Sequence, residues 1–209
     1  MSGVVLWDVD TQVDFVRADG KLPVPDAESV VPAMGRLVRW AEEHGVVHLA
    51  TADDHELTDP EISDDPDYEA TYPPHCLRGT PGAAKVPETA QRDPLPISLT
   101  PYPPGLVPRL VEGRRELLLL KKTYSAFSNP NLEPLLQALA PTEVVLFGVA
   151  TDVCNHAAIV GLRARGYAVA FVADAARGLS EERVAASLAH WREAGVRFTT
   201  TDEVVGAAP

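Results

Sequence analysis

Cysteine is scarce in this chain, with two residues among 209. Two cysteines in a chain of this size form no disulfide framework, so the sequence predicts a protein of the reducing cytoplasm. Long apolar runs are also missing, and none approaches the ~20 residues that cross a bilayer. The first residues, MSGVVLWDVD, lack a basic stretch followed by a long apolar one, so we expect no signal peptide.

Basic residues are outnumbered, since 18 Lys and Arg stand against 30 Asp and Glu and leave a net charge of −12. This balance argues against an extended surface for nucleic acid or anionic membrane, although a local site can still bind a small anion. The first apolar run is not followed by G-x-G-x-x-G, which excludes a Rossmann dehydrogenase, and we expect no nucleotide cofactor. The G-x-S-x-G turn of serine hydrolases is absent too.

Continuous apolar runs are present instead, and such runs are typical of strands buried on both faces of a parallel sheet. They span 3–9, 46–51, 116–121, 143–149 and 167–174, and a sixth strand is expected within 197–205. Helical periodicity fills the intervals 26–44, 131–140, 151–165 and 180–195. Alternating strands and helices predict an α/β fold with a mostly parallel, doubly wound sheet of about six strands.

One domain is predicted for residues 1–209, because the chain shows neither repeats nor a dividing linker. Many of its 19 prolines gather between Pro60 and Pro108, which predicts a long irregular excursion at about 52–108. In open α/β sheets, ligands bind at the C-terminal ends of the strands, near the change in strand order. The candidates for function are therefore the residues that follow the apolar runs.

Three chemically active residue types follow three different runs: an acid at Asp10, a lysine at Lys121 or Lys122, and a thiol at Cys154. A thiol in the first turn of a helix, beside an ammonium group, has its pKa lowered to roughly 3.5–7.5. A carboxylate can accept the thiol proton and return it to a leaving group, while N–H groups at the helix start hold an oxyanion. The set suits acyl transfer. Each residue alone also fits a structural role, so only their joint placement favours catalysis.

A second polar group lies in the excursion, where ATADDH (50–55) precedes YPPHCLRGTPGA (72–83). Asp53 and His55 are two residues apart on an extended piece and can point to the same side, and His75 follows two prolines. Asp, His and His suit a divalent transition metal that keeps open coordination positions. A metal-free alternative, in which the histidines are merely solvated, stays open.

Three motifs resemble those of the isochorismatase-like cysteine hydrolases, and the nicotinamidase branch most closely. VDTQVDF (9–15) resembles the first-strand motif, whose leading acid is catalytic and here is Asp10. KKTYSAF (121–127) resembles the lysine motif and selects Lys121, while GVATDVC (148–154) resembles the nucleophile motif and selects Cys154. The resemblance extends from the first strand to about Asp174. It implies a three-layer α/β/α sandwich, a cis peptide between Val149 and Ala150, and an oxyanion hole formed by the N–H groups of Ala150 and Cys154.

The resemblance also implies an activity, namely hydrolysis of nicotinamide to nicotinic acid and ammonia through a thioester on Cys154. In nicotinamidases the Asp-x-His and Pro-Pro-His residues bind one divalent metal ion that holds the pyridine nitrogen. Zinc is the expected ion, with iron or manganese as alternatives. The family's further histidine ligand is missing from ELTDPEISDD, so Glu61 is the expected replacement, ahead of Asp64. Ring-pocket positions of the family are matched by Phe15, Tyr72, Tyr124 and Val149.

Other functions stay open on the sequence alone. The substrate could be another small amide, such as a ureidoacrylate, a maleamate or a cyclic amide. An isochorismatase would cleave a vinyl ether, which needs no thiol and leaves the Asp-His-His segment unexplained. A non-catalytic binding protein would not need the acid, lysine and cysteine together. The expected partner is a small-molecule amide, without nucleic acid or membrane, and a homo-oligomer is left open. Cys76 lacks a strand-to-helix setting and is expected to be structural.

Overall fold

The computed structural model describes residues 3–207, so the first two and last two residues of the predicted 1–209 domain lie outside the described residues. Seven strands form one sheet in the order β3-β4-β2-β1-β5-β6-β7, and every pairing is parallel. The strands are β1 Val4–Val9, β2 Val47–Asp53, β3 Leu95–Ile97, β4 Glu116–Lys121, β5 Glu143–Val149, β6 Val169–Arg177 and β7 Arg197–Thr199. The predicted doubly wound parallel sheet is confirmed.

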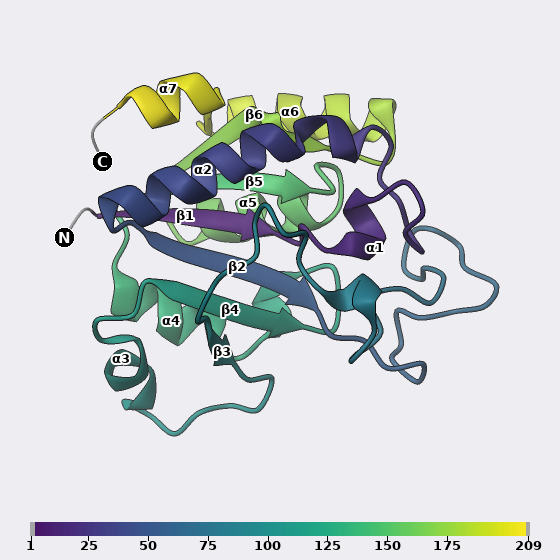
Figure 1. The fold of residues 1–209 in the computed structure, drawn as a ribbon, viewed down its shortest axis with the longest axis horizontal. Coiled ribbons are helices and arrows are strands. Elements are labelled where there is room, and N and C mark those ends of the chain that lie inside the picture. Colours follow the sequence, from purple (N-terminus) through teal and green to yellow (C-terminus); the bar gives the residue numbers. More distant parts are fainter. Residues whose placement is uncertain (1–2, 208–209) are drawn as a thin grey trace.

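Helices cover both faces of the sheet and give the predicted three layers (Figure 1). They are α1 Val13–Val16, α2 Val31–His44, α3 Leu106–Val111, α4 Leu132–Leu139, α5 Cys154–Ala164, α6 Glu181–Glu193 and α7 Thr201–Gly206, with short 3₁₀ turns η1 Ala27–Val30, η2 Pro81–Ala83 and η3 Ala126–Ser128. One apolar cluster joins the sheet to α2 and α7. The other joins it to α3, α4, α5 and α6. Among residues 3–207, no helix is both long enough and apolar enough to cross a membrane.

The continuous apolar runs are explained by this double cover. In β1, Val5 and Trp7 belong to the cluster under α4, α5 and α6, whereas Leu6 between them belongs to the cluster under α2. Successive side chains of a strand point to opposite faces, so a strand covered on both sides must be apolar at every position. The helical stripe predicted within 26–44 is buried as well, including Met34 and Leu37.

The predicted sixth strand at 197–205 is wrong beyond Thr199, where a helix follows. Thr200 accepts a hydrogen bond from the N–H of Glu203, and the Glu203 side chain accepts one from the N–H of Thr200. This reciprocal capping box starts α7 and ends the strand after three residues. A further strand was missed within the proline-rich excursion, where Leu95–Ile97 pairs with β4. The sheet consequently has seven strands instead of about six.

Parallel pairing brings the C-terminal ends of β1, β2, β4 and β5 to one edge of the sheet, on the right in Figure 1. The strand order changes direction at β1, which has β2 on one side and β5 on the other. The excursion after β2 runs over this edge (Figure 1). Gly148 permits the close approach of β5 to β1, because its φ is 120° and a Cβ there would collide with the carbonyl oxygen of Val9.

Candidate active site

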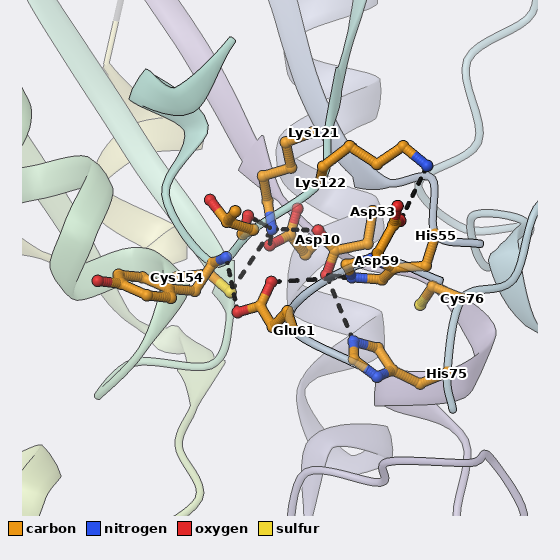
Figure 2. A network of polar contacts seen from close by, with 12 residues as sticks. Asp10, Asp53, His55, Asp59, Glu61, His75, Cys76, Lys121, Lys122 and Cys154 are labelled. Atoms are coloured by element: carbon orange, nitrogen blue, oxygen red, sulfur yellow. Dashed lines mark hydrogen bonds and ion pairs between the residues drawn. The ribbon is translucent and has the colours of Figure 1, made fainter. Parts of the chain in front are cut away.

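Four strands deliver the polar residues of the candidate site, shown in Figure 2. Asp10 follows β1 in a left-handed backbone conformation with φ 50°, which aspartate tolerates better than most residues. Asp53 ends β2 and Lys121 ends β4, while Cys154 opens α5 after the turn that follows β5. The structure therefore brings together Asp10, Lys121 and Cys154, as the sequence predicts.

Lys121 is the centre of this group and is fully buried. Its Nζ lies 2.9 Å from Asp10 Oδ2 and 3.8 Å from Cys154 Sγ, and it also forms an ion pair with Asp53. The second oxygen of Asp10 accepts a hydrogen bond of 2.7 Å from the Thr51 hydroxyl. Lys121 thus joins the thiol to two carboxylates.

Lys122 points away from this group, and its Nζ lies 2.8 Å from Asp59 Oδ2. The KKTYSAF motif (121–127) selects the first lysine for the catalytic group, and this geometry agrees with that choice. Alternate side chains of a strand point to opposite faces. Only one of two consecutive lysines can therefore face the cysteine.

The pKa of the Cys154 thiol is raised, contrary to the expectation of a lowered pKa. Burial raises its pKa well above the ordinary value, Lys121 opposes this rise, and Asp10 adds to it. Burial also raises the pKa of Asp10, although Lys121 works against that shift. For Lys121 burial lowers the pKa, but Asp10 and Asp53 outweigh it and raise the pKa well above its usual range. Burial thus raises the pKa of both the thiol and the Asp10 carboxyl, whereas the neighbouring carboxylates raise the pKa of the lysine.

The turn before α5 presents free backbone N–H groups. The expected cis peptide between Val149 and Ala150 is present. The Asn155 N–H donates to the Ala150 carbonyl at 3.1 Å, and the Asn155 side chain donates to the Gly148 carbonyl at 3.0 Å. By contrast, the N–H groups of Ala150 and Cys154 form no turn or loop hydrogen bond within residues 3–207. Both are available to an oxygen atom placed beside the thiol.

Next to the thiol lies the second predicted group. His55 Nε2 and His75 Nε2 are each 3.7 Å from Asp53 Oδ2, and one ligand atom from each of the three residues lies within 4.8 Å of the others. Glu61 Oε2 is 3.9 Å from His55 Nε2. His55 Nε2 and Glu61 Oε2 are both buried without a hydrogen-bond partner in the described chain. Unpaired buried nitrogen and oxygen atoms that face one another fit a metal ion well.

Outer partners orient these groups, and two of them were missed from the sequence. His75 Nδ1 lies 2.7 Å from the Pro73 carbonyl, and His55 Nδ1 lies 3.2 Å from Asp59 Oδ2. Gln12 clamps the backbone of Asp53, accepting from its N–H at 2.7 Å and donating to its carbonyl at 2.8 Å. Gln12 stands inside the VDTQVDF motif, so the motif could have indicated it. Nothing in the sequence singled out Asp59.

A cavity opens beside Cys154, with about 360 Å³ of space including its mouth. Phe15, Tyr72 and Tyr124 line it, as predicted, whereas Val149 does not. Val149 is fully buried in the core on the α2 side, because a strand residue can face either the core or the site. Apolar walls that the sequence did not indicate come from Leu22, Val24, Val153 and Leu179. Phe15 and Tyr72 flank the His75 ring at centroid distances of 5.2 and 6.2 Å.

Cys76 differs from Cys154 in its surroundings, because only Cys154 lies beside the Lys121 ammonium and lines the cavity. Cys76 is fully buried, and its N–H donates to Asp14 Oδ2 at 2.7 Å. Burial, with a contribution from Asp53, raises its pKa far above the usual thiol value. These features agree with the structural role expected of it.

Comparison with known proteins decides the family. Residues 97–203 match the isochorismatase domain model. The nicotinamidase/pyrazinamidase of Mycobacterium tuberculosis is 30% identical over 196 residues, covering 91% of this chain and 95% of that protein. This chain belongs to the isochorismatase family.

Solved structures agree with this placement of the isochorismatase-family chain. A pyrazinamidase/nicotinamidase from Streptococcus mutans is 26% identical, with a TM-score of 0.74, and covers 94% of this chain and 99% of its own. A pyrazinamidase of Pyrococcus horikoshii in complex with zinc is 24% identical, with a TM-score of 0.71, and covers 95% of this chain and 99% of its own. The chain is a hydrolase of the isochorismatase family, on its nicotinamidase branch.

Proposed function

We propose that the protein is a nicotinamidase-like amidohydrolase that converts nicotinamide to nicotinic acid and ammonia. One observation carries the proposal: a thiol beside Lys121, which pairs with Asp10, lines the same small cavity as Asp53 and His75 of the Asp-His-His group. A thiol beside an acid and a base suits cleavage of an amide bond. The likeness to nicotinamidases supports nicotinamide as the amide.

The first half of the reaction forms a thioester. The Cys154 sulfur attacks the carboxamide carbon while the thiol proton passes to Asp10. The carboxamide oxygen becomes negative where the N–H groups of Ala150 and Cys154 face it, and these two donors stabilise it. Asp10 then gives its proton to the amide nitrogen, the carbon–nitrogen bond breaks, and ammonia leaves. Lys121 stays charged throughout and stabilises the negative charge that moves between sulfur and carboxylate.

The second half releases the acid. A water molecule adds its oxygen to the acyl carbon and gives a proton to Asp10. The carbon–sulfur bond breaks, and Asp10 returns the proton to Cys154. Asp10 thus serves as base and then as acid in each half, which suits a carboxyl group whose pKa burial has raised. The site ends each cycle with the proton back on Cys154.

A divalent ion would be held by Asp53, His55 and His75, with Glu61 as a further ligand. The unpaired Nε2 of His55 and Oε2 of Glu61 support this assignment, and zinc is the first candidate because a related structure contains it. Bound there, the ion would offer an open coordination position to a pyridine nitrogen. The aromatic rings of Phe15 and Tyr72, beside His75, would hold the flat face of the substrate ring.

An ammonia-release screen tests the proposal. The purified protein is assayed on nicotinamide, pyrazinamide and small aliphatic amides, with added zinc, iron or manganese and after chelation. We expect turnover of the two ring amides and its loss on chelation. Turnover of aliphatic amides alone, unchanged by chelation, would refute nicotinamide as the substrate. The candidates would then be the other small amides, namely a ureidoacrylate, a maleamate or a cyclic amide. Absence of turnover on every amide would refute the amidohydrolase.

A further inference from the structure

Asp59 lies outside the group that would bind metal, yet three partners meet at one of its oxygens, and two of them, His55 and Lys122, are labelled in Figure 2. Its Oδ2 lies 3.2 Å from His55 Nδ1, accepts the Glu56 N–H at 2.9 Å, and lies 2.8 Å from the Lys122 Nζ. The Asp59 side chain is 13% exposed and the His55 side chain is fully buried. A carboxylate held by an ammonium and a backbone N–H has little freedom to turn away from the histidine.

We propose that Asp59 is a positioning residue for the metal site, fixed in place by Lys122; the inference rests on the metal site of the proposed function. Because a carboxylate oxygen accepts hydrogen bonds, its contact with His55 Nδ1 favours the tautomer that carries the hydrogen on Nδ1 and the lone pair on Nε2. That nitrogen faces Asp53 Oδ2 at 3.7 Å and Glu61 Oε2 at 3.9 Å, which is where an ion would lie. Asp59 therefore selects the ring orientation and the tautomer that can bind an ion.

The two histidines are supported in different ways. His75 donates through Nδ1 to the Pro73 carbonyl, a neutral acceptor that belongs to its own turn. His55 donates to a carboxylate four residues away, which makes its Nε2 more basic and a better ligand. Removal of such an outer carboxylate typically weakens metal binding by roughly 10–100-fold. The loss should fall on His55, because among the described ligands of the group it is the one that Asp59 pairs with.

Lys122 helps to hold the Asp59 carboxylate in place. Its side chain is 25% exposed, and besides Asp59 it lies 3.7 Å from Glu56. It belongs to the strand-end pair Lys121–Lys122, whose first member faces the thiol and whose second faces away. The second lysine thus supports the metal side of the same cavity. Its loss should weaken metal binding less than loss of Asp59, because the backbone N–H of Glu56 still holds the carboxylate.

Metal affinity of the full chain tests the inference without measuring activity. The protein is stripped with a chelator, and its zinc dissociation constant is measured by competition with a chromophoric chelator. The variants are Asp59→Ala, Asp59→Asn and Lys122→Met, and the matched control is Asp65→Asn, an exposed acid in the same loop. We expect Asp59→Ala to weaken binding by roughly 10–100-fold, Asp59→Asn and Lys122→Met by less, and the control to match the unaltered protein.

A second readout reports on geometry. The visible absorption of bound Co²⁺ depends on its ligands, so it should change in Asp59→Ala and stay unchanged in the control. Asp59→Asn has nearly the same shape and keeps the test available if the alanine variant does not fold. Unchanged affinity and spectrum in both Asp59 variants, with His55→Ala losing the metal, would overturn the positioning role alone. An unaltered protein that binds neither zinc nor Co²⁺ would overturn the metal site together with this inference, whatever its amidase activity.

Discussion

A buried ion pair beneath the active site makes Lys85→Met an informative substitution. The Lys85 Nζ lies 3.1 Å from Asp8 Oδ2 and donates to the Thr51 carbonyl at 2.8 Å. The Asp8 side chain is fully buried and that of Lys85 is 8% exposed. His48 Nε2 is 3.6 Å from the same Asp8 oxygen, and the Thr11 hydroxyl donates to it at 3.0 Å.

Removal of Lys85 leaves a buried carboxylate without its cation. Breaking one partner of a buried pair costs about 3–5 kcal/mol, because the remaining charge is desolvated and uncompensated. For a chain of this size, each kcal/mol lowers the melting temperature by about 2–4 °C. We therefore expect Lys85→Met to lower the free energy of unfolding by about 3–5 kcal/mol and the melting temperature by roughly 6–20 °C near neutral pH.

The pH dependence gives the sign of the effect. In the unaltered protein burial raises the pKa of Asp8, but Lys85 and His48 outweigh it and leave the pKa below its ordinary value. The pair therefore stabilises the fold above the ordinary aspartate pKa of about 4, and this contribution is lost as the pH falls through the lower, folded pKa. Without Lys85, burial raises the pKa of Asp8, so the destabilisation should shrink as the pH falls toward about 4.

Urea unfolding near pH 7 and near pH 4.5 measures both quantities. The double variant Asp8→Asn with Lys85→Met removes both charges and should recover much of the lost stability. A loss below about 1 kcal/mol for Lys85→Met, the typical value of a surface pair, would refute the buried-pair reasoning. So would a double variant as unstable as the single one.

Other predictions concern the candidate catalytic residues. Cys154→Ala should abolish amide hydrolysis with an unchanged circular dichroism spectrum, and substantial turnover by it would contradict the thioester. Asp10→Asn should lower kcat by roughly 10²–10⁴-fold, since an amide neither accepts nor returns the proton; ammonia release measures this. Lys121→Ala should lower kcat severely and Lys122→Ala mildly at saturating metal. Equal losses of kcat would contradict the assignment of Lys121, as against Lys122, to the catalytic group. Iodoacetamide should modify Cys154 before Cys76, and the reverse order by peptide mass spectrometry would exchange their roles.

Regular elements of the fold were predictable because each carries its own local signal. The runs at 116–121 and 143–149 coincide with β4 and β5, since buried parallel strands need apolar residues at every position. Leu95–Ile97 has only three residues, one of them proline, and becomes a strand only by pairing with β4. The strand predicted at 197–205 was wrong for another reason, because the capping residues Thr200 and Glu203 stand among residues that favour strands.

Site residues followed the same division. Asp10, Lys121 and Cys154 stand at strand ends within motifs, so sequence order and sheet topology sufficed to bring them together. Residues that act through distant contacts gave no such signal. Asp59 reaches His55 only because the loop after β2 folds back, and Leu179 reaches the cavity from the segment after β6. The raised pKa of Cys154 was missed because burial, which no motif reports, outweighs the nearby ammonium.

Asp53 divides its carboxylate between two tasks, with Oδ1 on Lys121 and Oδ2 toward both histidines. Under the proposed function, a substitution at this residue would disturb bond cleavage and ring anchoring at once. The apolar side chains of Leu22, Val24 and Leu179 only line the cavity and do not have these two roles. A change of substrate should therefore start with substitutions at these three wall residues. They are also the positions to randomise first in an engineered library.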